Sequence, residues 1–572
     1  MAANAATRRS RASQLPQCLA WLVLLAPTLG WSDAPPSTAA FAPGSAPSNV
    51  ELEGHVRFSA SGLTVVEHIR APFLPPTPSD LPDIDVDLVQ SGQDLLPARR
   101  GLVTTTHPLF DYFVGPGRVW SENGHARGSL PITLMYRDDG LINCAHNGLI
   151  GFTYTKTSID DVQILVDQET CHFVKFDLWG AGRATYAPHR VDGAEAIRTA
   201  FAQERSDRIP TKPLAALATD YGADVTRLLG GLPRDDDLTT AGAYFEGTHY
   251  TNGCSTRSGP YPYCEVMLLT SFSTAKTAFP ALVLMSLAER DGLAVYREKI
   301  ADYVPEVKDS PGDWRGVTFD QVGDMTSGNF INGEPMADAF IADFYADNDR
   351  ATKLAAALGW PNGAKAGTRF VYQTADTFIL VNAIDGYLAK HREGRGQARS
   401  HGSETQDAFD YLVEHVLKPL HVAPDVLSVR RTREGGINNS GTPIGGMGLW
   451  WTADAIVKVA RLMALDGGKI GDRQVLEPHA LAAALQRDPN DRGVATYFFG
   501  NYYNNGTWAF PLALFPNNRF ACGAWVPFMT GLSGVRVAMM PNGFIFYYFD
   551  DSQSFPMLES IDVADHIRPL CP

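Results

Sequence analysis

Strand patterns at both ends of the chain, with helical patterns between them, constrain the fold of this sequence most. Segments such as HVRFSA and LPITLMYR mix β-branched and aromatic residues with polar ones, and they recur from about residue 50 to about residue 201. Near the C-terminus two apolar runs flank Pro541-Asn542-Gly543, a strong signal for a hairpin. Strands, then helices, then strands indicate an α+β fold, an α/β sandwich whose sheet is completed by the C-terminus.

The middle of the chain has helical periodicity. A buried helix is predicted from Thr274 to Arg290, because apolar residues recur there at helical spacing until Asp291-Gly292 ends the pattern. Further helices are expected at residues 193–203, 211–229, 337–358, 374–390, 405–417 and 452–466. A chain of 572 residues has room for roughly two to four domains, or for one large domain with insertions. We predict a β-rich N-terminal domain at 49–204, whose role no motif indicates, and a second domain at 205–572.

The N-terminus has the pattern of a secretory signal. Three arginines precede a short apolar run, CLAWLVLLAPTL, and small residues follow it. This arrangement predicts a signal peptide at residues 1–31, and the run is too short to span a bilayer comfortably. A retained membrane anchor is the alternative. Residues 32–48 are rich in Pro, Ala and Ser and are predicted to be a disordered linker. The mature protein is expected to be periplasmic or extracellular, with no stable membrane span.

Six cysteines lie outside the predicted signal peptide. An even number of cysteines in an exported chain favours disulfides, although free buried thiols are the alternative. Among the possible pairings, the one that joins sequence neighbours is Cys144–Cys171, Cys254–Cys264 and Cys522–Cys571. None of these cysteines has C-x-x-C spacing, so a zinc site is not indicated and no cofactor or metal is expected.

The net charge limits the classes of partner that this protein is expected to bind. The formal net charge is −15, and no basic stripe offsets it, which argues against nucleic acid as a partner. It also gives no reason to expect binding to an anionic membrane, and it suits an exported protein that stays in solution. Nothing in the pattern indicates an oligomeric state.

The segment Ser273-Thr274-Ala275-Lys276 lies where a predicted strand passes into the buried helix. Residues three apart share one face of a helix, so the amine of Lys276 can reach the hydroxyl of Ser273. A serine hydroxyl becomes a good nucleophile when a base removes its proton, and lysine is such a base if its surroundings lower its pKa. By itself this motif is weak. A helix-capping serine followed by a lysine that extends to solvent is the alternative.

Further motifs follow in a fixed order. After SFSTAK come AERDG, KIADYVPE, GDMTSG, AGTRFVYQT, GGMGLWWTADAIVKVARLMALDGGKIGDRQVLEP and, before the hairpin, PFMTG. This order resembles the serine β-lactamase and penicillin-binding-protein superfamily, in particular its class C β-lactamase-related branch. That branch includes family VIII esterases, D-aminopeptidases and 6-aminohexanoate-dimer hydrolases. The resemblance covers residues 205–572 and implies a β-lactamase-like transpeptidase fold, an antiparallel sheet with an all-helical subdomain.

The resemblance implies roles for individual residues. Ser273 is acylated, Lys276 takes or shares its proton, and Tyr372 is the second acid or base. A phenol with a pKa near 10 can act as a base only beside a cation, which Lys276 would supply. The backbone N–H groups of Ser273 and Leu532 form the oxyanion hole, where negative charge develops in the transition state. An ordinary core tyrosine is the alternative for Tyr372.

The remaining implied contacts are with substrate, through Thr374, Thr530 and Gly531. Two motifs depart from the pattern of the superfamily. Thr374 stands where the superfamily usually has Asn or Ser, and it offers no amide to a substrate carbonyl. Met529 stands where β-lactamases have the lysine, and some relatives a histidine, that binds the carboxylate of the β-lactam. A plain strand threonine is the alternative for Thr530.

These departures favour a serine hydrolase of the carboxylesterase, amidase or peptidase type over a specialised β-lactamase. Its substrate is expected to be a small-molecule or peptide-like ester or amide. The alternative function is a catalytically inactive, penicillin-binding-protein-like binding module of the cell envelope. No G-x-S-x-G and no H-E-x-x-H occurs, so a nucleophile elbow and a zinc hydrolase are not indicated. The aromatic run at residues 497–508 either walls the cleft or belongs to the core.

Overall fold

The computed structural model describes residues 34–137, 143–233, 237–393 and 406–571. Residues Pro35–Pro572 form one compact unit. The predicted signal peptide at residues 1–31 lies outside the described residues. None of the described helices is long and apolar enough to cross a bilayer.

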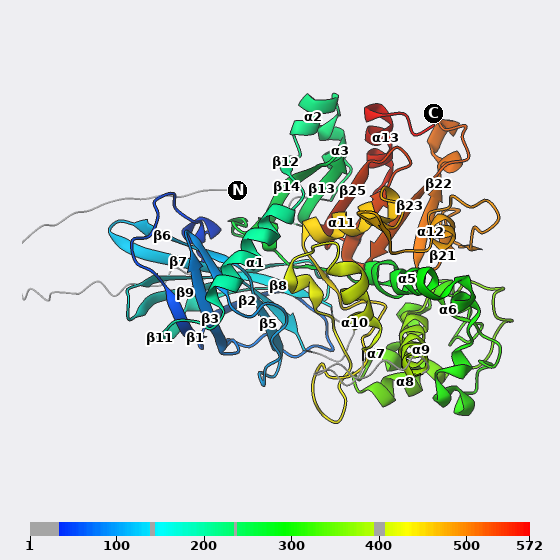
Figure 1. The fold of residues 1–572 in the computed structure, drawn as a ribbon, viewed down its shortest axis with the longest axis horizontal. Coiled ribbons are helices and arrows are strands. Elements are labelled where there is room, and N and C mark those ends of the chain that lie inside the picture. Colours follow the sequence, from blue (N-terminus) through cyan, green and yellow to red (C-terminus); the bar gives the residue numbers. More distant parts are fainter. Residues whose placement is uncertain (1–33, 138–142, 234–236, 394–405, 572) are drawn as a thin grey trace, which may run out of the picture. The chain divides into compact units, whose positions relative to one another are not determined.

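An antiparallel sheet of eleven strands occupies the first third of the chain (Figure 1, blue to cyan). Its order is β11-β1-β3-β4-β6-β7-β8-β9-β10-β2, and β5 pairs with β7. The strands are β1 Glu53–Ser59, β2 Thr64–Arg70, β3 Ile84–Ser91, β4 Asp94–Pro97, β5 Phe110–Val114, β6 Gly117–Glu122, β7 His125–Tyr136, β8 Ala145–Tyr154, β9 Ile159–Glu169, β10 Val174–Ala181 and β11 Arg183–Pro188. This sheet is the predicted β-rich region. Helix α1 Ala194–Asp207 follows it.

A second sheet joins the start and the end of the remaining chain. Its order is β12-β14-β13-β25-β24-β23-β22-β21-β20, antiparallel except for the pair β12 and β14. The strands are β12 Thr211–Pro213, β13 Leu238–Phe245, β14 Thr248–Thr256, β20 Val494–Ala495, β21 Tyr502–Asn504, β22 Thr507–Pro511, β23 Trp525–Gly531, β24 Val535–Met539 and β25 Ile545–Asp550, with β15 Gly259–Pro260 paired to β14. The pairing of β13 with β25 is the predicted completion of the sheet by the C-terminus.

Helices cover both faces of the second sheet. Apolar residues of α11 Ala453–Ala464 share a core cluster with Val535 and Val537, whereas α13 Leu558–Ile567 packs with Phe528 and Tyr548 from the opposite face. The helices α6 Phe319–Gly323, α7 Ala342–Tyr345, α8 Arg350–Leu358, α9 Thr374–Glu393 and α10 Ala408–Leu412 form a group of their own in Figure 1. The predicted α+β class is confirmed.

Three predicted helices are broken in the structure, each for a local reason. The helix expected over residues 211–229 is β12 followed by α2 Ala216–Tyr221 and α3 Val225–Gly230, because Gly222 ends α2 in a left-handed conformation. The helix expected from Thr274 to Arg290 consists of α4 Thr274–Lys276, a π-helical turn Thr277–Ala281 and α5 Leu282–Asp291. Pro280 lies in the π-helical turn, where its missing N–H would interrupt regular α-helical bonding. The helix expected over residues 337–358 is broken, because the Asp349 side chain accepts from Thr352 N and starts α8 afresh.

The segment predicted as a disordered linker also differs from that expectation. Thr38–Phe41 form one turn of 3₁₀ helix, and Phe41 is 1% exposed in the main core cluster. The backbone N–H of Thr38 donates to Ser258 O at 3.3 Å. An aromatic side chain that the composition does not highlight therefore fixes this segment to the folded unit.

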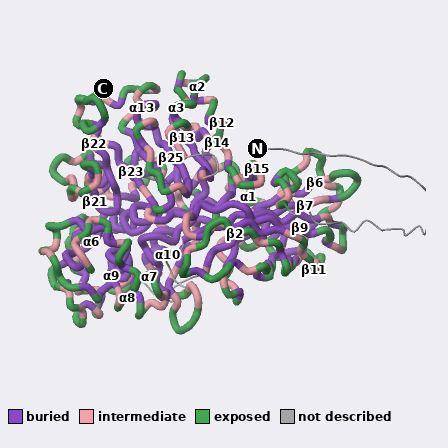
Figure 2. The backbone as a smooth tube through the Cα atoms, turned by 180° about the vertical axis from the view of Figure 1, so that it is seen from behind, coloured by how far each residue is buried: buried purple, intermediate pink, exposed green. Residues whose placement is uncertain are grey.

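The two sheets share one core. The largest cluster of buried apolar residues includes Leu134 and Leu149 of the first sheet together with Val537 and Tyr547 of the second, and buried backbone runs through both (Figure 2). The three predicted disulfides are present, Cys144–Cys171, Cys254–Cys264 and Cys522–Cys571.

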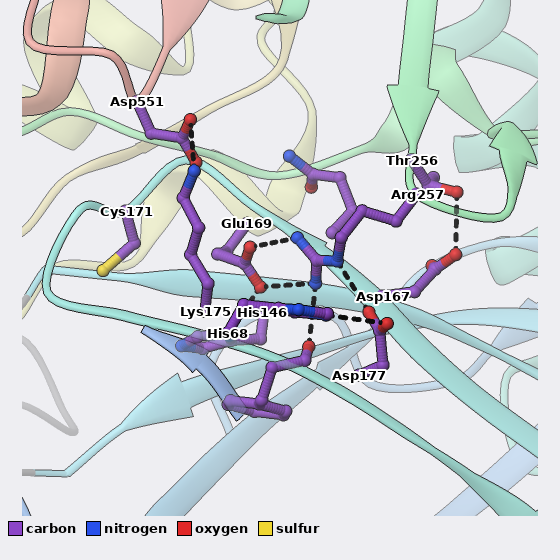
Figure 3. Close-up of polar contacts among 12 residues, drawn as sticks. His68, His146, Asp167, Glu169, Cys171, Lys175, Asp177, Thr256, Arg257 and Asp551 are labelled. Carbon is purple, nitrogen blue, oxygen red and sulfur yellow. Dashed lines mark hydrogen bonds and ion pairs between the residues drawn. The ribbon is translucent and has the colours of Figure 1, made fainter. Parts of the chain in front are cut away.

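A buried ionic cluster also crosses from one sheet to the other (Figure 3). Arg257, between β14 and β15, pairs with Glu169 of β9 and lies 2.6 Å from Asp177 of β10. Lys175 of β10 lies 2.8 Å from Asp551, the residue after β25. The first sheet is thus fixed to the second by charge as well as by apolar packing.

Candidate active site

The predicted nucleophile lies on a tight turn between a short strand and a helix. β16 Leu269–Thr270 pairs with β17 Trp450–Trp451, and the chain then turns through Ser271 and Phe272 into α4. Phe272 has φ +39°, a left-handed conformation that costs a residue with a side chain roughly 1–2 kcal/mol. Its neighbours Ser271 and Thr274 are fully buried, whereas Ser273 is partly exposed. The turn therefore presents one hydroxyl from an otherwise buried segment.

Lys276 meets this hydroxyl as the i, i+3 spacing predicts. Its Nζ donates to Ser273 Oγ at 2.9 Å, to Thr374 Oγ1 at 2.8 Å and to Gly446 O at 3.2 Å. The side chain is buried, and burial lowers the pKa of Lys276 to about 8, although the charge of Asp338 opposes that shift. A Cβ on residue 446 would lie 2.4 Å from Thr374 Cγ2, so only glycine fits against this lysine. An amine with this pKa is partly neutral near pH 7 and can accept a proton.

Tyr372 lies beside the same amine. Lys276 Nζ is 4.7 Å from the centroid of the Tyr372 ring, a cation–π arrangement. The ring packs against Trp508 and Tyr503, with centroids 5.6 Å and 6.1 Å away. Burial and then the charge of Asp338 raise the pKa of Tyr372, while a side-chain hydrogen bond with Ser273 opposes the rise. This direction differs from the expectation that the neighbouring cation would let the phenol act as a base, because desolvation and the charge of Asp338 outweigh the hydrogen bond with Ser273.

Asp338 is a residue of the site that the sequence motifs missed. Its two carboxylate oxygens accept from Thr374 N at 2.5 Å and from Thr374 Oγ1 at 2.8 Å. The segment that carries it is held by Tyr372 N donating to Pro335 O and by Ala337 N donating to Tyr372 O, both at 2.9 Å. The Thr374 hydroxyl, predicted to contact substrate, links Lys276 to Asp338.

The end of β23 lies against the nucleophile turn. A Cβ on residue 531 would lie 2.8 Å from Ser271 O and 3.2 Å from Ser273 N, so Gly531 allows the two backbones to approach. No described residue accepts a hydrogen bond from the N–H of Ser273. Leu532, the second predicted oxyanion-hole residue, follows directly and its side chain is 40% exposed. Thr530 donates from Oγ1 to Val535 O at 3.1 Å, across the turn that follows.

Apolar and aromatic side chains flank this polar centre. Met529, which stands where β-lactamases have a lysine, is fully buried in the core. The aromatic run divides: Tyr503 and Trp508 are buried against Tyr372, whereas Phe499 is 86% exposed. Within the described ranges no group of three or more His, Cys, Asp or Glu side chains is arranged to hold a metal ion.

Comparison with known proteins finds solved structures to which this chain has a low similarity. No family model matches the chain, and no curated protein matches it. The solved structures include a class C β-lactamase mutant (TM-score 0.41, 16% identity, 62% of this chain and 96% of that chain). They also include a penicillin-binding-protein homologue from Caulobacter crescentus (TM-score 0.38, 17% identity, 64% and 97%). A family VIII carboxylesterase is a third (TM-score 0.37, 15% identity, 64% and 97%).

Proposed function

We propose that this chain is a serine hydrolase that forms an acyl-enzyme on Ser273 and acts on esters or amides. The observation that carries the proposal is the 2.9 Å contact between the buried Lys276 Nζ, with a pKa of about 8, and the partly exposed Ser273 Oγ. A nucleophile and a base within hydrogen-bond reach, with the base held by a third group, is the arrangement that activates a serine. Thr374 and Gly446 supply that third contact.

In the acylation step, Ser273 Oγ attacks the carbonyl carbon while its proton passes to the neutral amine of Lys276. The carbonyl oxygen becomes negative and accepts from the N–H groups of Ser273 and Leu532. The bond from the carbonyl carbon to the leaving alcohol or amine then breaks, and that group takes a proton from the Lys276 ammonium. Water attacks the acyl-enzyme in the same way, releasing the acid and restoring the Ser273 hydroxyl.

Tyr372 enters this scheme as a neutral phenol. Its raised pKa keeps the proton on the oxygen near neutral pH, so it acts as an acid: it donates its proton to the leaving group while it accepts the one that Lys276 took from Ser273. Lys276 is therefore the better candidate for the base. This assignment refines the shared role that the sequence motifs imply for the two residues.

The surroundings support an ester or amide that lacks the carboxylate of a β-lactam. Met529 is buried and supplies no cation at the expected position. We include in the proposal a substrate of small-molecule or peptide-like type and a protein exported from the cytoplasm. The three disulfides support export, because disulfides persist in oxidising compartments.

A labelling experiment separates the hydrolase from an inactive binding module. The protein is incubated with a fluorophosphonate and with a labelled penicillin, and the adduct is located by mass spectrometry. We expect fluorophosphonate labelling of Ser273 that is lost in Ser273→Ala and in Lys276→Met. Lys353→Met is the matched control, because Lys353 is also fully buried but donates to Phe344 O. Absence of labelling by both reagents in folded protein would refute the proposed activity.

A further inference from the structure

The first sheet reaches the proposed active site through two residues that flank one disulfide. Asn143 precedes Cys144, just before β8 begins, and His172 follows Cys171 between β9 and β10. Neither residue belongs to the motifs from which the site was predicted. Each contacts a different one of the two turns that carry the proposed oxyanion-hole N–H groups.

Asn143 holds the turn of the nucleophile. Its buried Oδ1 accepts from Ser271 Oγ at 3.0 Å, from Phe272 N at 3.1 Å and from Gly448 N at 3.0 Å. Its backbone O accepts from Thr270 Oγ1. The bond to Phe272 N fixes the one left-handed residue of this turn, directly before Ser273. A conformation of this kind persists only where surrounding contacts enforce it.

His172 supports the turn after β23, which carries Leu532 and Ser533. Its Nδ1 lies 2.9 Å from Ser533 Oγ, one residue after Leu532. Ser533 is fully buried and has φ +74°, the second left-handed residue with a side chain at this site. Burial and then the charge of Lys175 lower the pKa of His172 to about 4, so the imidazole is neutral at neutral pH. Ser533 O also accepts from Gln553 N.

The disulfide Cys144–Cys171 connects the two supports covalently. The strands on either side of it pair in register, with His146 opposite Glu169. Glu169 in turn pairs with Arg257, which follows β14 of the second sheet (Figure 3). The end of the first sheet that carries Asn143 and His172 is therefore fixed by a disulfide, by strand pairing and by a buried ion pair.

We propose that Asn143 and His172 are positioning residues that hold the N–H groups of Ser273 and Leu532 in place, and that the disulfide sets the separation between them. This inference rests on the proposed serine hydrolase activity. It gives the first sheet, for which no motif indicates a role, a part in forming the oxyanion hole. Positioning of hydrogen-bond donors in advance is a large source of rate enhancement in such sites.

The test measures the rate constant of phosphonylation and the apparent affinity for the fluorophosphonate separately, at the high-pH plateau. Asn143→Leu should slow phosphonylation at least tenfold with little change in apparent affinity. Asn143→Asp keeps the accepting oxygen and should recover most of the rate. Asn147→Leu is the matched control, because Asn147 is buried in β8 but bonds to Gln168 and Leu268 O instead of the nucleophile turn.

Two further variants keep the test decisive if Asn143→Leu does not fold. Ser533→Ala removes only the hydroxyl that meets His172 and should slow phosphonylation at least threefold. Cys144→Ala/Cys171→Ala should slow it about tenfold, whereas Cys522→Ala/Cys571→Ala should not.

Wild-type rates in folded Asn143→Leu or Ser533→Ala would overturn the positioning role. A wild-type rate without the Cys144–Cys171 bond would overturn the role of the disulfide. If the wild-type protein itself takes no label, the proposed hydrolase activity fails instead, so the two failures are distinguishable.

Discussion

Asp338→Asn changes one charge beside Lys276 and leaves the shape of the site nearly unchanged. Thr374 Oγ1 lies 2.8 Å from Lys276 Nζ and 2.8 Å from Asp338 Oδ2, so the two charged groups are at most about 5.6 Å apart. At an effective dielectric constant of about 20, unit charges at that distance attract by roughly 3 kcal/mol, or about two pKa units. Asparagine keeps an oxygen to accept from Thr374 N, so the cap on α9 is preserved.

The expected result is a shift of the pH profile of acylation toward acid. In the wild-type protein the amine of Lys276 has a pKa of about 8, so the rate should rise as the pH passes through that value. The negative charge of Asp338 favours the ammonium form, and its removal therefore lowers the pKa of Lys276. The half-maximal rate should move from about pH 8 toward about pH 6.

The assay is fluorophosphonate labelling between pH 5.5 and 9.5, corrected for the reactivity of the reagent alone. Asp343→Asn is the control, because Asp343 is an exposed carboxylate on α7, where solvent screens its charge. The control should keep the wild-type midpoint. An unchanged or higher midpoint in Asp338→Asn would refute the assignment of Lys276 as the base whose charge Asp338 controls.

Two further predictions concern Tyr372 and Arg257. Tyr372→Phe keeps the ring over Lys276 but removes the hydroxyl, so ester turnover should fall roughly 10²- to 10⁴-fold with thermal stability near that of wild type; unchanged turnover would contradict a proton-transfer role. Arg257→Met leaves Glu169 buried without its cation and should lower the free energy of unfolding by about 3–5 kcal/mol in urea titrations. Burial alone would raise the pKa of Glu169, but Arg257 lowers this pKa below the usual 4.5. The ion pair therefore stabilises the wild-type protein above pH 4.5, and this contribution to the free energy of unfolding should be lost as the pH falls below 4.5. A loss under about 1 kcal/mol would mean that water solvates the cluster.

Local patterns account for what could be predicted. Ser273 and Lys276 are in contact because residues three apart in a helix lie on the same face. This geometry does not depend on the rest of the fold. The hairpin β24–β25 follows from the Asn-Gly turn between two apolar runs. The α+β class follows from the order of strand and helix patterns, each of which has its own period.

The same local view explains two departures. The helix expected at 337–358 has helical composition, but Asp349 caps a new helix within it. The segment at 32–48 has the composition of a linker, yet Phe41 is buried among residues far along the chain. Composition averages over a segment and therefore does not reveal one residue that finds a distant partner.

The tertiary structure alone decided the rest of the site. Asp338, Asn143 and His172 belong to no motif, and of their residue types Asp and Asn usually face water whereas His is intermediate in burial. They matter because the fold brings them to the predicted site from other segments of the chain: Asp338 to Thr374, Asn143 to the N–H of Phe272 and His172 to the hydroxyl of Ser533. The direction of the Tyr372 pKa was likewise set by burial and by Asp338, neither of which a motif records. Sequence determines the chemistry that neighbours along the chain can share, whereas desolvation and contacts between distant segments exist only once the chain has folded.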